Sequence, residues 1–488
     1  MMQPWPTGGV WMLLVLAMLI ISTGLPVWAL LIGTASAFAA GGWAVGLIDA
    51  RVLSAISGRT LGLLEHDLLQ ALPLYVFVGI LLQRLTVADA LFSSLAQLFR
   101  WTGAGTSVAA FGVGALVAPM NGSVASSSVM LARLVAPRLG QLNAAAATAL
   151  TSASSTIGVV VPPSLVLILL GDAMLRAHTE ASNLPGFVLG SQRIINTQDV
   201  FHAALVPAAC VLALWLLVAW WQGRKFQHPD TTQPVSRSQW TVSAVVTTAT
   251  LVLLGGVFVG KIFAVEAAAT GAVCLIGATL ATRALSRPQW MTVLADTLSL
   301  SGALLALLVG ASTFSLVFRL WGTDAWITHA VLASPLSPLL TAALVLLLVA
   351  LCAWVLDAFE MIFVIIPIVA PPLIAHLGDA QQTAVLLLLV LQLSFLIPPM
   401  GYAVMMARAR SGLINTSIWH TLRALLPYIA AQCAVTTLVF MQPWTVHQLD
   451  PAPAAVAEEA ALPGEDLDQL MRDMANQGNA DEAKKTAE

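Results

Sequence analysis

The sequence predicts an all-α membrane protein, a polytopic bundle of two inverted repeats with two re-entrant hairpins and two broken helices. First, 58% of the 488 residues are hydrophobic and 9% are charged, with a mean hydropathy of +0.87, whereas charged residues make up about a quarter of a soluble domain. Second, apolar runs of bilayer-crossing length recur along the chain. Third, two of these runs contain a Pro-Pro pair in their middle.

The apolar runs follow one another across most of the chain. They lie at 9–46, 70–95, 107–137, 144–175, 200–221, 240–260, 265–282, 292–318, 338–377, 382–407 and 418–441. The segment MMQPWPTGG before the first run contains no Lys or Arg. A secretory signal has a basic start, so we expect no cleaved signal and interpret the first run as a retained span.

The composition excludes several function classes. The cysteines lie far apart inside apolar runs, which favours packing over a disulfide or metal role; they are Cys210, Cys274, Cys352 and Cys433. The eight histidines show no ligand spacing, and we find no phosphate-binding glycine loop and no nucleophile motif. We therefore expect neither an enzyme, nor an ATP site, nor a nucleic-acid partner.

The C-terminal end differs from the rest of the chain. Residues 445–488 hold ten acidic and three basic residues among many Ala. Such a composition cannot bury enough apolar surface to fold alone. We expect a soluble, mostly disordered tail with one short helix near 467–474.

Basic residues predict the orientation of the spans. Lys and Arg of short loops stay in the cytoplasm, so Arg224, Lys225 and Arg237 place the linker 223–239 inside. Threading outward from this linker makes the hairpin at 107–137 enter from the cytoplasm and the hairpin at 338–377 open to the opposite side. It also places both chain ends in the periplasm.

An internal offset supports the duplication that such an inversion requires. Three pairs of landmarks are each 236 positions apart: Gly24 with Gly260, Asn121 with Asp357, and Pro162 with Pro398. We predict a first repeat at 1–222 with a broken helix at 144–175. The second repeat is predicted at 240–444 with a broken helix at 382–411.

The Pro-Pro pairs predict two cation sites. A proline cannot donate to the carbonyl four residues earlier, and a free carbonyl inside lipid is costly unless it lines a cavity or binds an ion. The affected residues are Gly158 and Val159 before Pro162 and Pro163, and Ser394 and Phe395 before Pro398 and Pro399. Sodium is satisfied by such oxygen ligands. The alternative for each pair is a plain proline kink.

Polar residues at membrane depth predict the first hairpin tip. The segment 118–130 contains an Asn-Gly turn signal and several hydroxyls that can ligate an ion: Asn121, Gly122, Ser123, Ser126, Ser127 and Ser128. Small-residue helix packing is the alternative. The stretch TSASST at 151–156, which includes Ser155, either lines the ion path or bonds to its own backbone.

The second predicted tip carries two carboxylates. Asp357 and Glu360 interrupt apolar sequence, and ionisable residues at this depth are usually functional. Asp357 is a candidate ligand for a sodium ion or a proton, or alternatively the N-cap of the hairpin's second arm. Arg133 and Arg408 lie near the tips and are candidates for binding a carboxylate, although positive-inside anchoring is the favoured interpretation.

Several motifs together resemble the large membrane subunit of tripartite ATP-independent periplasmic (TRAP) transporters. Their order and spacing carry the resemblance across residues 10–440. They are TGLPV (23–27), ALPLYVFVGILL (71–82), NGSVASSS (121–128), IGVVVPPS (157–164), GKIFAVEAAATGA (260–272), LDAFEMIFVIIPIVAPPL (356–373) and IPPMGYAV (397–404).

The resemblance implies a multi-pass protein of the bacterial inner membrane that imports an organic acid by an elevator-type movement driven by sodium. It implies two partners, a periplasmic substrate-binding protein and a small four-helix membrane subunit, which we expect to be a separate chain. The implied sodium ligands are Asn121, Gly122, Ser123, Ser126, Gly158, Val159 and Pro162 at the first site, and Asp357, Ser394, Ile397, Pro398 and Gly401 at the second. The implied substrate residues are Ser127, Ser155, Pro163, Glu360, Pro399 and Met400.

The sequence also departs from the family pattern. It has Asn-Gly-Ser where the family more often has a Ser-Gly-Ser type, and Ile-Pro-Pro at 397–399 where Thr-Pro-Pro is common. Two alternatives remain open at this stage. One is a stand-alone sodium–carboxylate symporter or sodium–proton antiporter, and the other is a non-transporting scaffold whose acidic tail recruits a partner.

Overall fold

The structure is a computed structural model whose described residues are 7–49, 55–64, 67–121, 124–140, 143–162, 164–184, 194–224, 235–353, 356–397, 401–411 and 417–450. Within these ranges all regular secondary structure is helical. Contacts divide the chain into two units, Met1–Gln448 and Leu449–Glu488. The predicted tail falls almost wholly outside the described residues, so its disorder stays a prediction.

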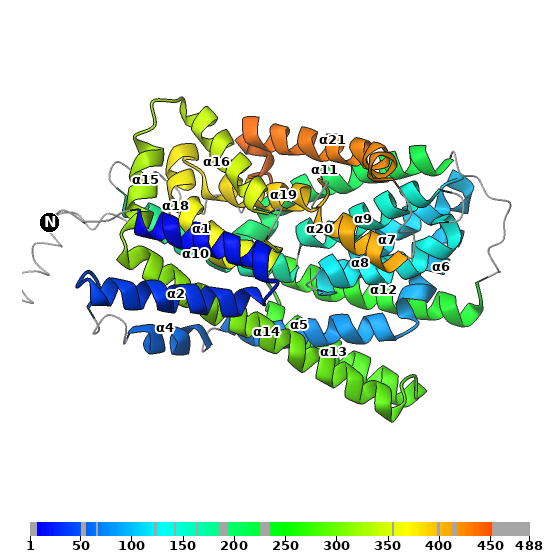
Figure 1. Cartoon of the computed structure of the whole chain (residues 1–488). Coiled ribbons are helices and arrows are strands. Elements are labelled where there is room, and N and C mark those ends of the chain that lie inside the picture. Colours follow the sequence, from blue (N-terminus) through cyan, green and yellow to red (C-terminus); the bar gives the residue numbers. More distant parts are fainter. Residues whose placement is uncertain are drawn as a thin grey trace, which may run out of the picture. The chain divides into compact units, whose positions relative to one another are not determined.

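The helices follow one another in the order shown by the colours of Figure 1. The first half contains α1 (Gly8–Thr23), α2 (Val27–Ala44), α4 (Ala55–Leu64), α5 (Asp67–Arg84), α6 (Val87–Leu98), α7 (Gly105–Asn121), α8 (Val124–Val135), α9 (Ala144–Val160), α10 (Leu165–Ala181) and α11 (Thr197–Gly223). The second half contains α12 (Arg237–Phe258), α13 (Ala264–Thr282), α14 (Arg287–Leu320), α15 (Thr323–Leu332), α16 (Pro338–Cys352), α17 (Ala358–Glu360), α18 (Ile366–Leu377), α19 (Ala380–Ser394), α20 (Tyr402–Ser411) and α21 (Ile418–Met441).

Many of these helices suit a bilayer. Seven helices of the described chain are long and apolar enough to cross a membrane, or up to nine if each of two bent pairs counts as one span. Their outer faces expose large apolar side chains, as lipid-facing helices do. The prediction of an all-α, polytopic membrane protein is confirmed.

The first apolar run, 9–46, forms two helices instead of one. Helix α1 ends at Thr23, and the next residue, Gly24, has a φ of 63°, a conformation that glycine adopts without steric cost. Pro26 then begins α2 with an extended backbone. The glycine and the proline together explain why the helix cannot continue.

The second run, 70–95, is also divided. Helices α5 and α6 meet at an angle of 67°. The two residues between them are Leu85 and Thr86, so the bend contains neither Gly nor Pro. Helix α6 packs on α7 and α12, so tertiary contacts hold the bend that the local sequence does not encode.

The hairpins pack on the broken helices. The first hairpin, α7 and α8, lies against α9. In the second hairpin, α16 and α18 lie against α19, and α18 also lies against α10. A further group contains α2, α5, α13 and α14. In this group α14 packs on α2 and on α5, and α13 packs on α5; α2 and α14 run side by side in Figure 1. That these segments are re-entrant hairpins and broken helices of two repeats stays a prediction.

Element boundaries repeat at the predicted offset. Helices α6 and α15 begin 236 positions apart, as do α9 and α19, and α5 and α14 end at that same spacing. The N-cap residues Asn143 and Asp379 each accept a hydrogen bond from the main-chain N–H three residues later, at 2.9 and 3.0 Å. Gly24 and Gly260 both have a positive φ. These matches support duplication, while the inverted membrane topology stays a prediction.

One aromatic cluster joins the two halves. The indole N–H of Trp215 on α11 donates to the main-chain oxygen of Tyr428 on α21 at 2.9 Å. Both rings also pack on Phe111 of α7, with centroid distances of 5.9 and 5.8 Å. All three side chains are fully buried, so this cluster holds α7, α11 and α21 in contact.

Candidate functional site

The first hairpin touches the first broken helix through backbone. A Cβ atom added to Gly158 of α9 would lie 2.5 Å from the carbonyl carbon of Ala118, and one added to Gly114 of α7 would overlap the main-chain oxygen of Ser154. Only glycine permits this approach. The two glycines therefore seat the end of α7 directly against the turn where α9 stops.

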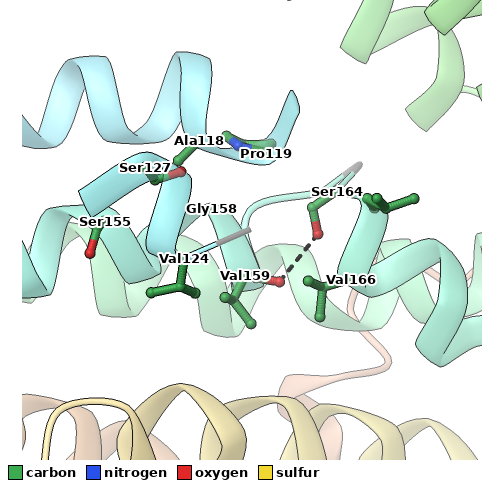
Figure 2. Close-up of a pocket in the computed structure, with 10 residues that line it drawn as sticks. Ala118, Pro119, Val124, Ser127, Ser155, Gly158, Val159, Ser164 and Val166 are labelled. Carbon is green, nitrogen blue, oxygen red and sulfur yellow. Dashed lines mark hydrogen bonds between the residues drawn. The ribbon is translucent and has the colours of Figure 1, made fainter. Parts of the chain in front are cut away.

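Helix α9 stops at Val160 because the chain becomes extended at Val161. The hydroxyl of Ser164, the N-cap of α10, accepts from the N–H of Leu167 at 3.2 Å and donates to the carbonyl of Val159 at 3.2 Å (Figure 2). The carbonyl of Val159, which was predicted to be freed for an ion, thus has one partner. A carbonyl oxygen has a second lone pair, so this bond does not exclude a cation.

A small cavity lies between the hairpin and the break. About 10 Å³ is open to the centre of a water molecule, close to the smallest space that holds one water. Figure 2 shows its walls, which come from α7, α8, α9 and α10: Ala118, Pro119, Val124, Ser127, Ser155, Gly158, Val159, Ser164, Leu165 and Val166. Four of these were predicted site residues, namely Ser127, Ser155, Gly158 and Val159.

The hydroxyls of this site are buried and ordered. Ser155 accepts a hydrogen bond from the hydroxyl of Ser128 on α8 at 2.8 Å and donates to the carbonyl of Ser152 at 2.9 Å. Ser127 lines the cavity and is almost fully buried. Hydroxyl and carbonyl oxygens in a space of this size suit a small hard cation.

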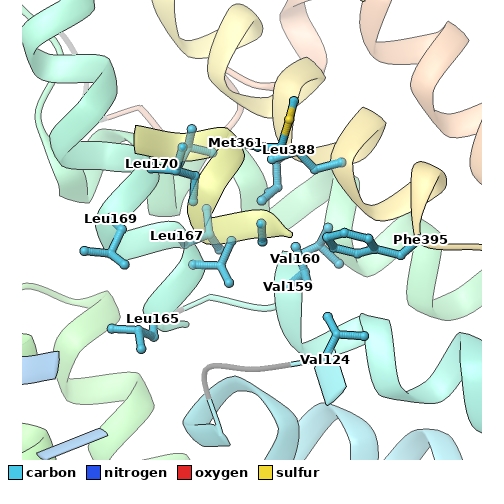
Figure 3. Close-up of a cluster of buried hydrophobic side chains, with 14 of the residues drawn as sticks. Val124, Val159, Val160, Leu165, Leu167, Leu169, Leu170, Met361, Leu388 and Phe395 are labelled. Carbon is cyan, nitrogen blue, oxygen red and sulfur yellow. The ribbon is translucent and has the colours of Figure 1, made fainter. Parts of the chain in front are cut away.

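An apolar shell surrounds the break. Figure 3 shows Val159 and Val160 of α9 near Phe395, beside the second break, and Leu165 and Leu167 of α10 belong to the same buried cluster. Apolar walls strengthen electrostatic attraction inside a cavity because they keep water away. The two breaks therefore share one buried region.

The second break is built differently. Helix α19 ends at Ser394, whose hydroxyl donates to Val390 within the helix at 2.8 Å. A Cβ added to Gly401 would lie 3.0 Å from the carbonyl oxygens of both Phe395 and Ile397. The Phe395 oxygen also accepts from the N–H of Ala403 at 3.2 Å. Two main-chain oxygens thus converge where the helix is interrupted.

The second tip places its carboxylates at the start of a helix. Asp357 occupies the N-cap position of α17, and the Glu360 carboxylate accepts from the Asp357 N–H at 3.0 Å. A π-helical turn, Met361–Ile365, follows. This arrangement matches the alternative capping interpretation of Asp357, and it occupies one oxygen of Glu360.

The remaining predicted residues lie elsewhere or outside the described residues. Ser126 receives a hydrogen bond from the amide of Gln83 on α5, and Pro162 lies in the bend after α9. Asn121 is the last residue of α7. Gly122, Ser123, Pro163, Pro398, Pro399 and Met400 fall outside the described residues. Arg133 pairs with Asp89 at 3.0 Å and is half exposed.

This geometry can be compared with known proteins. A family model described as "Tripartite ATP-independent periplasmic transporter, DctM component" matches residues 12–445. The chain belongs to this family. The permease is thus the large membrane subunit of a TRAP transporter, as the sequence motifs indicated, and its relatives are transport proteins and not enzymes.

The permease is similar to several characterised relatives. A C4-dicarboxylate TRAP transporter large permease from Rhodobacter capsulatus is 23% identical over 388 residues, covering 78% of this chain and 86% of the relative. A sialic acid TRAP transporter permease from Haemophilus influenzae is 22% identical over 447 residues, covering 90% and 67%. A sialic acid large permease from Vibrio cholerae is 23% identical over 393 residues, covering 79% and 86%.

A solved structure shares the fold of the permease. The Alcanivorax borkumensis YdaH transporter aligns with a TM-score of 0.58 and 15% identity, covering 82% of this chain and 91% of that chain. That structure is described as having an unusual topology. At this identity the likeness concerns the fold alone.

Sequence reasoning missed several residues of the first site. Ala118 and Ser164 line the cavity, and Gln83 reaches the hairpin from α5. Ser164 directly follows the Pro-Pro pair and begins an apolar run, which is an N-cap signal. No local signal marks Gln83, because its partner is 43 positions away.

Proposed function

We propose that the permease imports an organic acid by coupling its movement to sodium, and that a periplasmic binding protein delivers the cargo. The contact between the first hairpin and the first break, around a cavity lined by three serines among apolar residues, carries this proposal. Its oxygen ligands suit sodium. The C4-dicarboxylate and sialic acid named for the relatives are both carboxylates, which supports an organic acid as cargo.

The proposed coupling follows from the way the cavity is built. Its walls come from four helices, α7 and α8 of the hairpin and α9 and α10 of the broken helix. An ion that binds these walls favours the seated hairpin over a displaced one, and a ligand shifts an equilibrium by its differential affinity. Sodium binding would therefore hold the hairpin against the break before the carrier moves across the membrane.

The architecture supports alternating access. Matching helix boundaries 236 positions apart support two repeats, and inverted repeats allow one site to face either side in turn. We propose that the hairpins and broken helices move as an elevator-type unit past the group containing α2, α5, α13 and α14, carrying a substrate held between the two tips.

Partners and location complete the proposal. A separate small four-helix membrane subunit would brace the group that does not move. We place the complex in the bacterial inner membrane, with the N- and C-termini of the permease in the periplasm and the 223–239 linker in the cytoplasm, as the basic residues indicate.

Uptake into liposomes tests the proposal. The permease, its small subunit and its binding protein are reconstituted, and uptake of a panel of radiolabelled organic acids is measured with and without an inward sodium gradient. Uptake that requires sodium and the binding protein is expected. Uptake that ignores the sodium gradient would overturn the ion sites at both breaks, and uptake by the permease alone would support a stand-alone symporter.

A further inference from the structure

A second pocket lies away from the hairpin tips. It is bounded by one face of α10, by α14, and by the arm of the second hairpin that follows Glu360. About 110 Å³ of it is open to the centre of a water molecule, far more than the cavity at the first break. This space suits a small organic molecule and not only an ion.

Four charged side chains line this pocket in a balanced pattern. Asp172, Arg176 and Glu180 are spaced four residues apart on α10, so they share one face at intervals of about 6 Å. Arg176 pairs with Asp172 on the same helix. Arg319 of α14 reaches across to Glu180 at 2.5 Å. Two guanidinium groups and two carboxylates thus give a lining with no net charge.

The charged groups remain partly open to a ligand. The side chains of Arg176, Glu180 and Arg319 are 50%, 38% and 30% exposed, so a molecule in the pocket can reach them. Ser312 and Ser315 of α14 add hydroxyls, while Ile362 and Phe363 form an apolar wall. Polar groups on two sides and an apolar wall are typical of a small-molecule site.

The charge balance selects the kind of ligand. A simple anion that binds one of the arginines would displace the carboxylate with which that arginine is paired. The displaced carboxylate would then have no partner, and an unpaired charge in a partly dry site is costly. A molecule that carries both signs can give its carboxylate to an arginine and its ammonium to the displaced carboxylate. Every charge then keeps a partner.

We propose that this pocket binds a small zwitterion whose ammonium and carboxylate groups are separated by a short chain. The alternation of charge along α10 sets the spacing, and the apolar wall takes the methylene groups. The site goes beyond the proposed function, since binding requires neither sodium nor transport. A phosphatidylethanolamine headgroup carries the same pair of charges, so the lipid is a second source of the same chemistry.

Equilibrium binding tests the proposal on the full-length permease in nanodiscs made of phosphatidylglycerol, in sodium-free buffer. The probe is radiolabelled 4-aminobutyrate, competed by unlabelled butyrate, which lacks the ammonium, and by butylamine, which lacks the carboxylate. We expect both competitors to bind about tenfold more weakly than 4-aminobutyrate, because each loses one charge-assisted interaction. Equal competition by butyrate would overturn the proposal.

Variants locate the probe. Arg319→Gln is expected to weaken binding about tenfold, and Ser312→Phe, which fills the pocket but keeps all four charges, is expected to abolish it. Arg84→Gln is the control, because Arg84 forms a comparable pair with Asp296 at 2.8 Å outside the pocket. Normal binding by folded Ser312→Phe protein would exclude this pocket.

The lipid source is distinguished by repeating the measurement with phosphatidylethanolamine in the nanodiscs. Weaker 4-aminobutyrate binding there, restored in phosphatidylglycerol alone, identifies the headgroup as a competing occupant and supports the same pairing chemistry. Unchanged binding identifies a soluble zwitterion as the occupant. No binding in either membrane overturns the proposal, whatever the outcome of the transport assay.

Discussion

The side-chain amide of Gln392 donates to the main-chain oxygen of Thr156 at 3.3 Å, and these two residues are 236 positions apart. That separation is the offset at which helix boundaries of the two halves coincide. Residues related by a two-fold axis touch each other only close to that axis. The contact therefore supports an axis that passes between α9 and α19, four residues before the end of α9 and two residues before the end of α19.

The amide chain at this contact is expected to stabilise the permease. Gln432 of α21 donates to Gln392 at 2.8 Å and to the carbonyl of Leu389 at 3.3 Å, and both glutamines are fully buried. Gln392→Leu leaves buried polar groups unpaired, so we expect it to lower the free energy of unfolding by about 1–3 kcal/mol.

Thermal unfolding in detergent measures this effect. Gln432→Leu and the double variant complete a double-mutant cycle, and we expect the double variant to lose less than the sum of the single variants, because the two amides share one bond. Additive losses would mean that the glutamines do not act together.

Gly158→Ala is expected to unseat the first hairpin. The new methyl group would lie 2.5 Å from Ala118, backbone included, so α7 must shift, at a cost of about 1–3 kcal/mol. Sodium-driven uptake should fall sharply. Gly33→Ala on α2 is the matched control, since no atom lies within 4 Å of its added Cβ. Normal uptake by Gly158→Ala would show that the close contact does not matter for transport.

Ser155→Ala is expected to weaken the response to sodium. It removes a cavity hydroxyl and the bond to Ser128, worth about 1 kcal/mol, so the half-saturating sodium concentration should rise roughly fivefold. Ser154→Ala on the same helix removes only bonds to its own helix, at 2.6 and 3.3 Å. If both variants shift the sodium dependence equally, Ser155 has no special part in ion binding.

Glu360 is expected to act as a capping residue. Glu360→Gln keeps an oxygen that can accept from the Asp357 N–H, whereas Glu360→Ala loses it, at a cost of about 0.5–2 kcal/mol. We expect the melting temperature and uptake to fall in the alanine variant and to survive in the glutamine variant. Loss of uptake in a fully stable glutamine variant would instead assign the charge to cargo or ion binding.

The segments that broke apolar runs were predictable from the sequence. Helix α7 ends at Asn121 and α9 at Val160, next to the Asn-Gly and Pro-Pro signals in the sequence, and α7 and α8 occupy the segment 107–137 that was expected to form a hairpin. These features follow from backbone chemistry that neighbouring residues determine.

Features made by distant residues were not predictable. The bend between α5 and α6 has no breaking residue, and the Ser128–Ser155 bond joins separate helices. Arg319 pairs with Glu180, which lies 139 positions earlier, and nothing in the sequence around either residue predicts this pair. Such partners emerge only when the chain is packed.

The bond from Trp215 to Tyr428 has a consequence for biosynthesis. Its two residues are 213 positions apart, and at roughly 5–20 residues per second the ribosome needs about 10–40 s to deliver the second after the first. During that interval the nascent α11 holds a large aromatic side chain whose indole N–H still lacks the acceptor it has in the finished protein. We expect lipid, an insertase or a membrane chaperone to contact this side chain until α21 has been synthesised and packs on α11.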